Sequence, residues 1–313
     1  MNCILSPSTD PCFNLALEEV LLKGGKEEYA ILSINSAAVI TGKHQCTHRE
    51  ADTRFVTLNG IPVIRRISGG GTVFHDPGNL NFSFIRNCEE GKQIDFRKHT
   101  EPVIGFLRGN GIDARFEGKN DIRVNGLKIS GNAEHVHKNR VLHHGTLLFD
   151  SSLDHLRNSI RKDITHYNTR GVASNPSSVM NLKPLLNGVS DIFHFRDEML
   201  SFLTGYFPDF SIYHLSPSEK EEAEALAASK FRTWEWNFAY GPEYTFTNDL
   251  IFEGQRIIVS LDVKDGLISE CRIKGSEKLQ SLATRMKGMR HMPENLSGLL
   301  RLEGFDMDVF SYF

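Results

Sequence analysis

Three consecutive glycines, residues 69–71, interrupt a part of the sequence that is rich in strand-forming residues. They follow Arg65-Arg66-Ile67-Ser68, and residues 72–74 and 80–84, on either side of a turn at Asp76-Pro77-Gly78, have the composition of strands. Glycine permits backbone conformations that aim successive N–H groups into one concavity, and arginine offers a rigid fork to phosphate or carboxylate. The stretch predicts an anion-binding loop between strands, although a glycine-rich hairpin with surface arginines has the same composition.

Two common phosphate-binding motifs are absent from this loop. A P-loop and a dinucleotide-binding fingerprint both place their glycines at the start of a helix, whereas these glycines precede a strand. The formal net charge of -3 gives no global basic field, which argues against nucleic acid as a partner. No apolar run reaches the roughly 18 residues that a membrane span needs, so we expect no membrane segment.

The cysteines favour a reducing compartment. They are odd in number and include no Cys-x-x-Cys pair, so neither a disulfide framework nor a cysteine zinc site is expected. This composition fits the cytoplasm, and the start of the chain shows neither a signal-peptide pattern nor a transit-peptide composition. The histidines at 135, 137, 143 and 144 match no zinc spacing, so we expect no structural metal site there.

Hydrophobic periodicity predicts an α+β fold, and the length of 313 residues is enough for two domains. The pattern restarts near residue 241, which predicts a small α+β unit over 241–313 with strands at 244–251, 255–263 and 267–274 and helices near 277–288 and 293–301. Residues 165–190 are rich in Pro, Ser and Asn and predict a long loop, either disordered or a lid. In the first 240 residues we expect helices at 10–23, 48–58, 96–108, 191–206 and 216–230, and strands at 30–34, 37–40, 61–64 and 112–116.

Two further stretches place polar side chains beside strands. Asn120 and Asp121 precede a hairpin turn at Asn125-Gly126, and Lys128 follows that turn. A lysine on a hairpin is usually solvated, so its position alone indicates no function. Residues 142–149 predict a strand with two histidines and a glycine in its first half. Neither His-Glu-x-x-His nor Gly-x-Ser-x-Gly occurs, so metalloprotease and serine-hydrolase functions have no support.

Together these motifs resemble those of the lipoate-protein ligase A family, in the lipoate/biotin protein ligase superfamily. The segments that carry the resemblance are residues 10–19, 65–81, 120–133, 143–148 and 234–238. They occur in the family's order over nearly the whole chain. The resemblance implies a large catalytic domain over residues 1–240, with mixed and antiparallel sheets flanked by helices, and a C-terminal accessory domain over residues 241–313.

The resemblance also implies a reaction in two steps. Lipoate and MgATP would give lipoyl-AMP and pyrophosphate, and the lipoyl group would then pass to a lysine of an acceptor protein. The implied acceptors are the lipoyl domains of 2-oxoacid dehydrogenase complexes and the glycine cleavage H protein, and we expect a monomer. Lys128 would be the catalytic residue, Asp121 would lie beside Mg²⁺, and Leu80 and Phe82 would form an apolar wall for the lipoyl chain. The residues implied to bind lipoate or ATP are Arg66, Ser68, Gly69, Gly70, Gly71, Thr72, Val73, Phe74, His75, Asn120, Asp121 and Lys128.

Two departures from the family pattern leave an alternative open. Cys46 stands where the family usually has asparagine, and Pro176 and Ser178 stand where many of these ligases carry arginines. The alternative is a lipoyl or octanoyl transferase that uses a pre-formed adenylate or an acyl-carrier donor. Some such relatives use a cysteine thioester, but the chain has no cysteine between residues 88 and 271 to act as that nucleophile. Lys128 beside a complete glycine loop argues against a protein that only holds lipoate.

Overall fold

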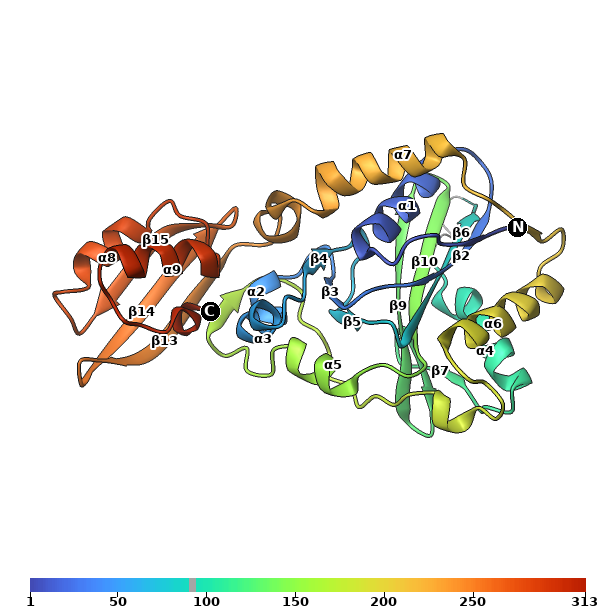
Figure 1. Ribbon diagram of the computed structural model, residues 1–313, viewed down its shortest axis with the longest axis horizontal. Helices are drawn as coiled ribbons and strands as arrows, with labels where there is room; N and C mark the ends of the chain where they lie inside the picture. The colour runs from blue at the N-terminus through green and yellow to red at the C-terminus, as the bar shows by residue number, and fades with distance from the viewer. Residues whose placement is uncertain (90–93) are drawn as a thin grey trace.

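The structure is a computed structural model that describes residues 1–89 and 94–313, and in these residues the strands form three sheets flanked by helices (Figure 1). The largest is an eight-stranded sheet of order β12-β1-β2-β6-β10-β9-β8-β7. β1 pairs in parallel with β2 and β12, and the remaining neighbours are antiparallel, which confirms the expected mixed sheet. Its strands are β1 (Asn2–Leu5), β2 (Tyr29–Ile34), β6 (Asn79–Asn87), β7 (Arg115–Glu117), β8 (Asp121–Val124), β9 (Leu127–His137), β10 (Arg140–Leu148) and β12 (Ser211–Ile212).

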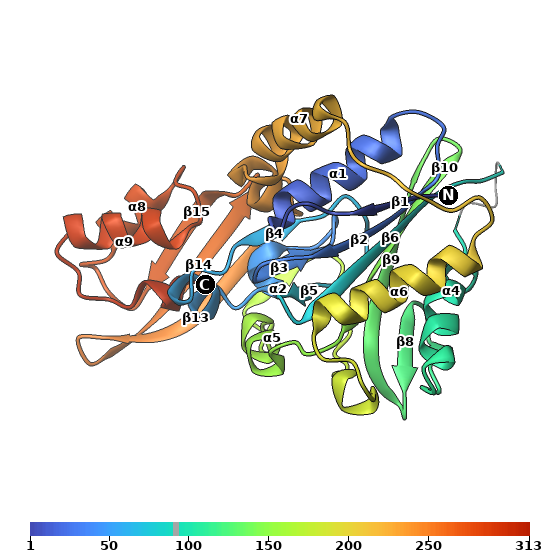
Figure 2. The same cartoon turned by 45° about the vertical axis from the view of Figure 1, so that its right-hand side comes forward.

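Helices cover both faces of this sheet (Figures 1 and 2). α1 (Pro11–Lys23) and α7 (Pro217–Leu226) pack with β2, β6 and β10 in one apolar cluster. α4 (Phe96–Gly109) and α6 (Ile192–Tyr206) pack on the opposite face in a second cluster. α1 begins as the sequence predicts, because the Asp10 side chain accepts a hydrogen bond from the Cys12 N–H at 2.8 Å. No helix in the described part of the chain combines the length and apolar character needed to cross a membrane.

A small sheet of order β4-β3-β5 carries the glycine loop. β3 (Ala38–Thr41) pairs in parallel with β4 (Val63–Arg65) and antiparallel with β5 (Val73–His75), so residues 66–72 connect the two outer strands past the end of β3. The helix expected at 48–58 is instead two short helices, α2 (Thr47–Glu50) and α3 (Thr53–Leu58). They are separate because Ala51 is extended and forms a bridge with Ile160, and Asp52 then caps a new helix.

The C-terminal residues form a four-stranded sheet with two helices on one face (Figure 1). Its order is β11-β13-β14-β15, and β11 comes from the middle of the chain. The division into 1–240 and 241–313 stays a prediction, and the core of the C-terminal sheet also includes Cys46 and Tyr167. The elements here are β11 (Tyr167–Thr169), β13 (Tyr244–Phe252), β14 (Gln255–Lys264), β15 (Leu267–Lys274), α8 (Gln280–Met286) and α9 (Pro293–Leu302). The remaining elements are α5 (Leu153–Ser159), the 3-10 turns Lys183–Leu185 and Val309–Tyr312, and the π turns Ala227–Phe231 and Glu235–Ala239.

Two buried histidines lie where the C-terminal sheet meets α2. The His291 ring stacks on Phe313 with centroids 4.3 Å apart, and its centroid lies 5.0 Å from that of His48. The Tyr244 hydroxyl lies 2.6 Å from His291 Nδ1, and His291 Nε2 donates to the Tyr312 carbonyl oxygen at 2.6 Å. A neutral ring with its proton on Nε2 satisfies both contacts when the Tyr244 hydroxyl donates to Nδ1. Burial lowers the pKa of His291 to about 4 and that of His48 well below its ordinary value.

We expect the free energy of unfolding to fall as the pH drops from about 6.5 towards about 4. The unfolded chain binds protons on these imidazoles near its ordinary pKa, whereas the folded chain keeps them neutral, so acid favours unfolding. For His291 alone, the loss between about pH 8 and about pH 5 is about 2 kcal/mol. Urea denaturation at both pH values should show a smaller loss in His291→Gln than in the wild type, while exposed His214→Gln should behave as the wild type. An unchanged pH dependence in His291→Gln would contradict the prediction.

Candidate active site

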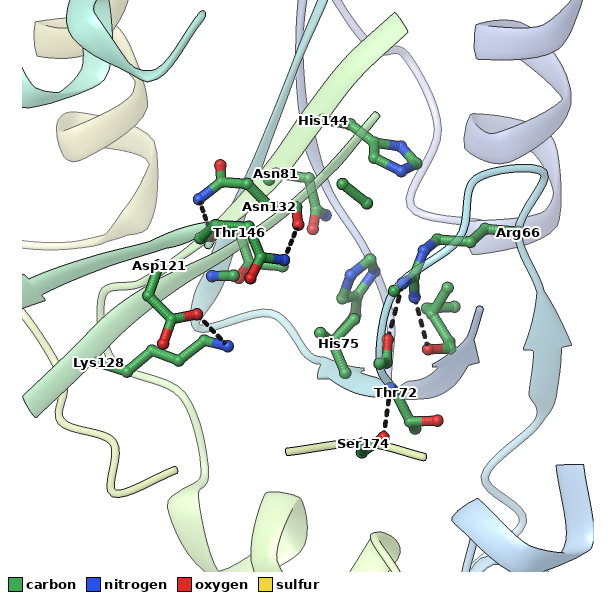
Figure 3. A pocket seen from close by; sticks show the side chains of 18 of the residues that line it. Arg66, Thr72, His75, Asn81, Asp121, Lys128, Asn132, His144, Thr146 and Ser174 are labelled. Carbon is green, nitrogen blue, oxygen red and sulfur yellow. Dashed lines mark hydrogen bonds and ion pairs between the residues drawn. The ribbon is translucent and has the colours of Figure 1, made fainter. Parts of the chain in front are cut away.

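A cavity of about 600 Å³ lies between the large sheet and the small sheet with the glycine loop (Figure 3). Its wall combines side chains of α1, the glycine loop, β5 and β6 with those of β8, β9, β10 and residues 172–177. The volume is within the range of roughly 300–1,000 Å³ that is typical of small-molecule sites. Lys128 and Asp121 lie on one side of the view and Arg66 and His75 on the other, so segments far apart in the sequence enclose one space (Figure 3).

Most of the residues that the motifs indicate line this cavity. Three of them are not among its lining residues in the described part of the chain. Ser68 is fully buried behind the loop, Gly69 contributes a carbonyl oxygen to Arg66, and Phe74 packs with Val39 and its apolar neighbours. Phe74 faces away because alternate residues of β5 point to opposite faces. Those that line the cavity are Arg66, Gly70, Gly71, Thr72, Val73, His75, Asn120, Asp121 and Lys128.

Arg66 braces the glycine loop from inside. Its Nη2 atom donates to the carbonyl oxygens of Gly69 at 2.6 Å and Gly71 at 2.7 Å. Burial lowers the pKa of Arg66 to about 10, which leaves the guanidinium charged at neutral pH. Gly70 has a φ of 87°, in the left-handed region, and a Cβ at Gly42 would lie 2.1 Å from the Gly70 carbonyl oxygen. Glycine is therefore required at position 70 for its backbone conformation and at position 42 for the close approach of the loop.

A buried chain of hydrogen bonds, which the sequence motifs do not indicate, orients Arg66. The Arg66 Nε atom donates to Ser68 Oγ at 2.9 Å, and the Ser68 hydroxyl lies 2.6 Å from His144 Nε2. The other ring nitrogen, His144 Nδ1, lies 2.9 Å from Glu18 Oε2. This pattern is consistent if each group donates to the next, from Arg66 through Ser68 and His144 to Glu18. Its only sequence signals are a glutamate on α1 and the two histidines of β10.

Lys128 and Asp121 form a charged corner of the cavity. Lys128 Nζ lies 2.8 Å from Asp121 Oδ1, and the two side chains are 22% and 15% exposed. A Cβ at Gly131 would lie 3.0 Å from Lys128 Nζ and 3.8 Å from Val73 Cγ1, which follows the glycine loop. Gly131 therefore leaves space for the lysine side chain, and the amine and the loop face the same cavity.

The long loop expected at 165–190 contains β11 and a 3-10 turn, and its middle part crosses the cavity. The Ser174 hydroxyl oxygen accepts from the Thr72 N–H at 2.8 Å, beside the glycine loop (Figure 3). At the far end, the Lys128 N–H donates to the Ser178 carbonyl oxygen at 2.9 Å. Pro176 lines the cavity in between. We call residues 171–178 the covering segment, because it is bonded to both sides of the site.

The prediction that Leu80 and Phe82 form an apolar wall of the cavity is wrong. Both side chains are fully buried in the core under α4 and α6, whereas Asn81 and Ser83 of the same strand line the cavity. Alternate residues of β6 point to opposite faces of the sheet. Its apolar residues Leu80 and Phe82 point to the face that α4 and α6 cover, and the polar residues between them point to the cavity. The apolar part of the cavity wall instead includes Leu15, Ile40, Val73 and Ala133.

Two places deserve comparison as cation sites. Asp121 offers a carboxylate, which suits Mg²⁺ bound mainly through substrate phosphates, and its oxygens now contact Lys128 and Arg123. Glu134 Oε1 lies 2.9 Å from a ring nitrogen of both His99 and His143, close enough to hold an ion. Two N–H···O bonds account for that second group without an ion, which leaves Asp121 as the candidate residue for Mg²⁺.

Comparisons with known proteins show the family of this chain. Residues 10–204 match the family model of the lipoyl protein ligase A/B catalytic domain. Lipoate--protein ligase 1 of Staphylococcus aureus (strain Mu50 / ATCC 700699) is 36% identical over 311 residues, which cover 97% of this chain and 93% of that protein. The chain belongs to the lipoate-protein ligase family.

Solved structures of similar fold cover the larger part of the chain. A putative lipoate protein ligase from Thermoplasma acidophilum with bound lipoic acid is 26% identical, has a TM-score of 0.65, and covers 76% of this chain and 98% of its own. The bi-partite ligase of that organism, studied with its E2 lipoyl domain, is 25% identical with a TM-score of 0.64 and covers 76% of this chain and 95% of its own. A lipoate-protein ligase A bound with ATP is 26% identical with a TM-score of 0.65 and covers 76% of this chain and 98% of its own.

Proposed function

We propose that this enzyme is an ATP-dependent lipoate-protein ligase that forms lipoyl-AMP in the cavity and transfers the lipoyl group to a lysine of an acceptor domain. One observation carries the proposal: the Lys128 amine and the glycine loop braced by Arg66 face one cavity of about 600 Å³. Relatives of the same fold with bound lipoic acid or ATP support these two substrates.

The first step joins two anions. A lipoate carboxylate oxygen attacks the α-phosphorus of ATP, and pyrophosphate leaves with the electron pair of the broken P–O bond. Catalysis of such a step depends on positioning and on offsetting negative charge. Lys128 bridges the carboxylate and the α-phosphate, and the loop N–H groups bind phosphate oxygens. Asp121 would hold Mg²⁺, which would offset negative charge on the phosphates.

The second step transfers the acyl group. The acceptor lysine, with an ordinary pKa of about 10.4, attacks as the neutral amine, so it has lost its proton before the C–N bond forms. The acyl carbonyl oxygen becomes negative as that bond forms, and AMP then leaves with its phosphate oxygen. Lys128 stabilises the developing oxyanion, because its ammonium group lies where the carboxylate was bound in the first step.

The proposed acceptors are the lipoyl domains of 2-oxoacid dehydrogenase E2 subunits and the glycine cleavage H protein. The Thermoplasma ligase and its E2 lipoyl domain support the first of these. We propose that the enzyme acts as a monomer in the cytoplasm, with residues 1–240 as the catalytic domain and 241–313 as the accessory domain. The five free cysteines of the described residues fit a reducing compartment.

Incubating the purified protein with lipoate, MgATP and an apo lipoyl domain tests the proposal. We expect pyrophosphate release, and mass spectrometry should show one lipoyl group on the acceptor lysine. Octanoate in competition with lipoate reports the acyl preference, and EDTA should stop the first step but not transfer from synthetic lipoyl-AMP. Modification only with added lipoyl-AMP would identify a transferase that uses a pre-formed adenylate, and no modification in either case would exclude both the ligase and that transferase.

A further inference from the structure

Two cations face each other across β8 and β9 at the cavity. Arg123 and Lys128 are register partners in this antiparallel pair, and like charges in that relation are destabilising. Asp121 bonds both of them, with Oδ2 2.7 Å from Arg123 Nη2 and Oδ1 2.8 Å from Lys128 Nζ. Neither cation forms another ion pair among the described residues. The group therefore places one unbalanced positive charge on the cavity wall, which suits an anion.

The Arg123 guanidinium is oriented before any ligand binds. Besides Asp121, its Nη2 atom donates to Ser177 Oγ at 2.7 Å, and its Nη1 atom donates to the Gly126 carbonyl oxygen at 2.9 Å. Its Nε–H and its second Nη1–H make no hydrogen bond within residues 1–89 and 94–313. The side chain is 24% exposed and lines the cavity. An oriented guanidinium with unused donors is suited to phosphate oxygens.

We propose that Arg123 binds the β- and γ-phosphates of ATP and stabilises pyrophosphate as it leaves. This inference rests on the proposed function. Lys128 serves the carboxylate and the α-phosphate, the atoms present in both steps, and Arg123, which lies beside it on the cavity wall, is placed to contact the rest of the phosphate chain. Charge on the pyrophosphate grows as the P–O bond to the α-phosphorus breaks, and a fixed guanidinium there lowers the barrier. Arg123 is then needed for the first step and dispensable for the second.

Arg123 has a competing structural role, because its bond to Ser177 holds the covering segment. Loss of that role would affect every ligand under the segment, including AMP and lipoyl-AMP. Loss of phosphate binding would affect ATP alone. A comparison of ATP with AMP, and of the two half-reactions, therefore separates the two roles.

Calorimetric binding of ATP and of AMP in the presence of Mg²⁺ is the direct test. Arg123→Gln should weaken ATP binding by about 10- to 100-fold and AMP binding by less than about 3-fold. Arg123→Lys should lose less, because it keeps the charge. The matched control is Arg115→Gln, which removes an exposed arginine opposite Arg123 on β7, outside the cavity, and should leave both affinities as in the wild type.

Three results would overturn the inference: unchanged ATP affinity in Arg123→Gln, equal losses for ATP and AMP, or the same loss in Ser177→Ala. In turnover, Arg123→Gln should slow pyrophosphate release but not transfer from synthetic lipoyl-AMP. If the wild type released no pyrophosphate, the proposed function would fail, and the binding comparison would still report whether Arg123 contacts the terminal phosphates.

Discussion

Replacing Lys128 with alanine should lower the rate of pyrophosphate release by at least about 10²-fold, because it removes the cation that offsets charge at the reacting atoms. The side chain lines the cavity, and its one ion pair within residues 1–89 and 94–313, with Asp121, is partly exposed. Its loss should therefore change stability by less than about 1 kcal/mol. Activity and stability are thus expected to separate at this residue.

Single-turnover pyrophosphate release and thermal unfolding of the same preparations measure this separation. Lys274→Ala, which removes an exposed lysine at the end of β15, is the matched control and should leave both quantities unchanged. Transfer from synthetic lipoyl-AMP should also slow in Lys128→Ala, because the same amine faces the acyl oxygen. Pyrophosphate release at the wild-type rate from a folded Lys128→Ala variant would remove Lys128 from the mechanism.

Replacing the preceding arginine of the pair, Arg65, with methionine should destabilise the fold by about 4 kcal/mol. Arg65 is fully buried, and burial lowers its pKa to about 10. Its guanidinium pairs with no carboxylate in the described residues. It donates to the Thr47 hydroxyl and to the carbonyl oxygens of Gly42, Lys43, Gln45, Trp236 and Asn237. Methionine would remove all of these hydrogen bonds. The carbonyl oxygens of Gly42 and Asn237 would keep one donor each, the Gln45 N–H and the Thr47 hydroxyl, whereas those of Lys43, Gln45 and Trp236 would lose the Arg65 donor.

Urea denaturation of Arg65→Met and of Arg256→Met distinguishes this role from a general effect of removing an arginine. Arg256 lies on β14 with its side chain 71% exposed, so its replacement should cost less than about 1 kcal/mol. If Arg65→Met unfolds during expression, Arg65→Lys can be measured in its place. Lysine keeps the charge but loses most of the guanidinium hydrogen bonds, so this variant should also be less stable than the wild type. Wild-type stability in both Arg65 variants would contradict the structural role.

Features set by neighbouring residues could be predicted from the sequence. The turns Asn125-Gly126, Glu253-Gly254 and Asp265-Gly266 all have positive φ at both residues, as their composition predicts. Ser216 and Glu219 form a capping box at the start of α7, where the Ser-x-x-Glu spacing predicts one. The hairpins of residues 244–274 follow for the same reason, because each is specified by local turn chemistry.

Features that depend on distant segments could not be predicted. The chain of hydrogen bonds from Glu18 to Ser68 joins α1, β10 and the glycine loop, and no local pattern indicates that these three meet. β6 is a second example. The alternation of apolar and polar residues in this strand defines two faces, but it does not indicate which face lines the cavity. The two arginines beside the loop have equal chemistry in sequence, yet Arg65 is structural and Arg66 reaches the cavity.

The short strand β11 connects the C-terminal residues with the site, although those residues do not line the cavity. Among the described residues, none beyond position 177 lines the cavity. β11, however, is an edge strand held by β13, and the covering segment begins two residues after it. A chain cut after residue 240 would leave β11 without its partner strand. The start of the covering segment would then be held only from within the remaining chain, through the Val172 N–H bond to the His44 carbonyl oxygen and the Ser174 bonds to Glu50 and Thr72. Truncation should therefore weaken substrate retention while sparing every residue that reacts.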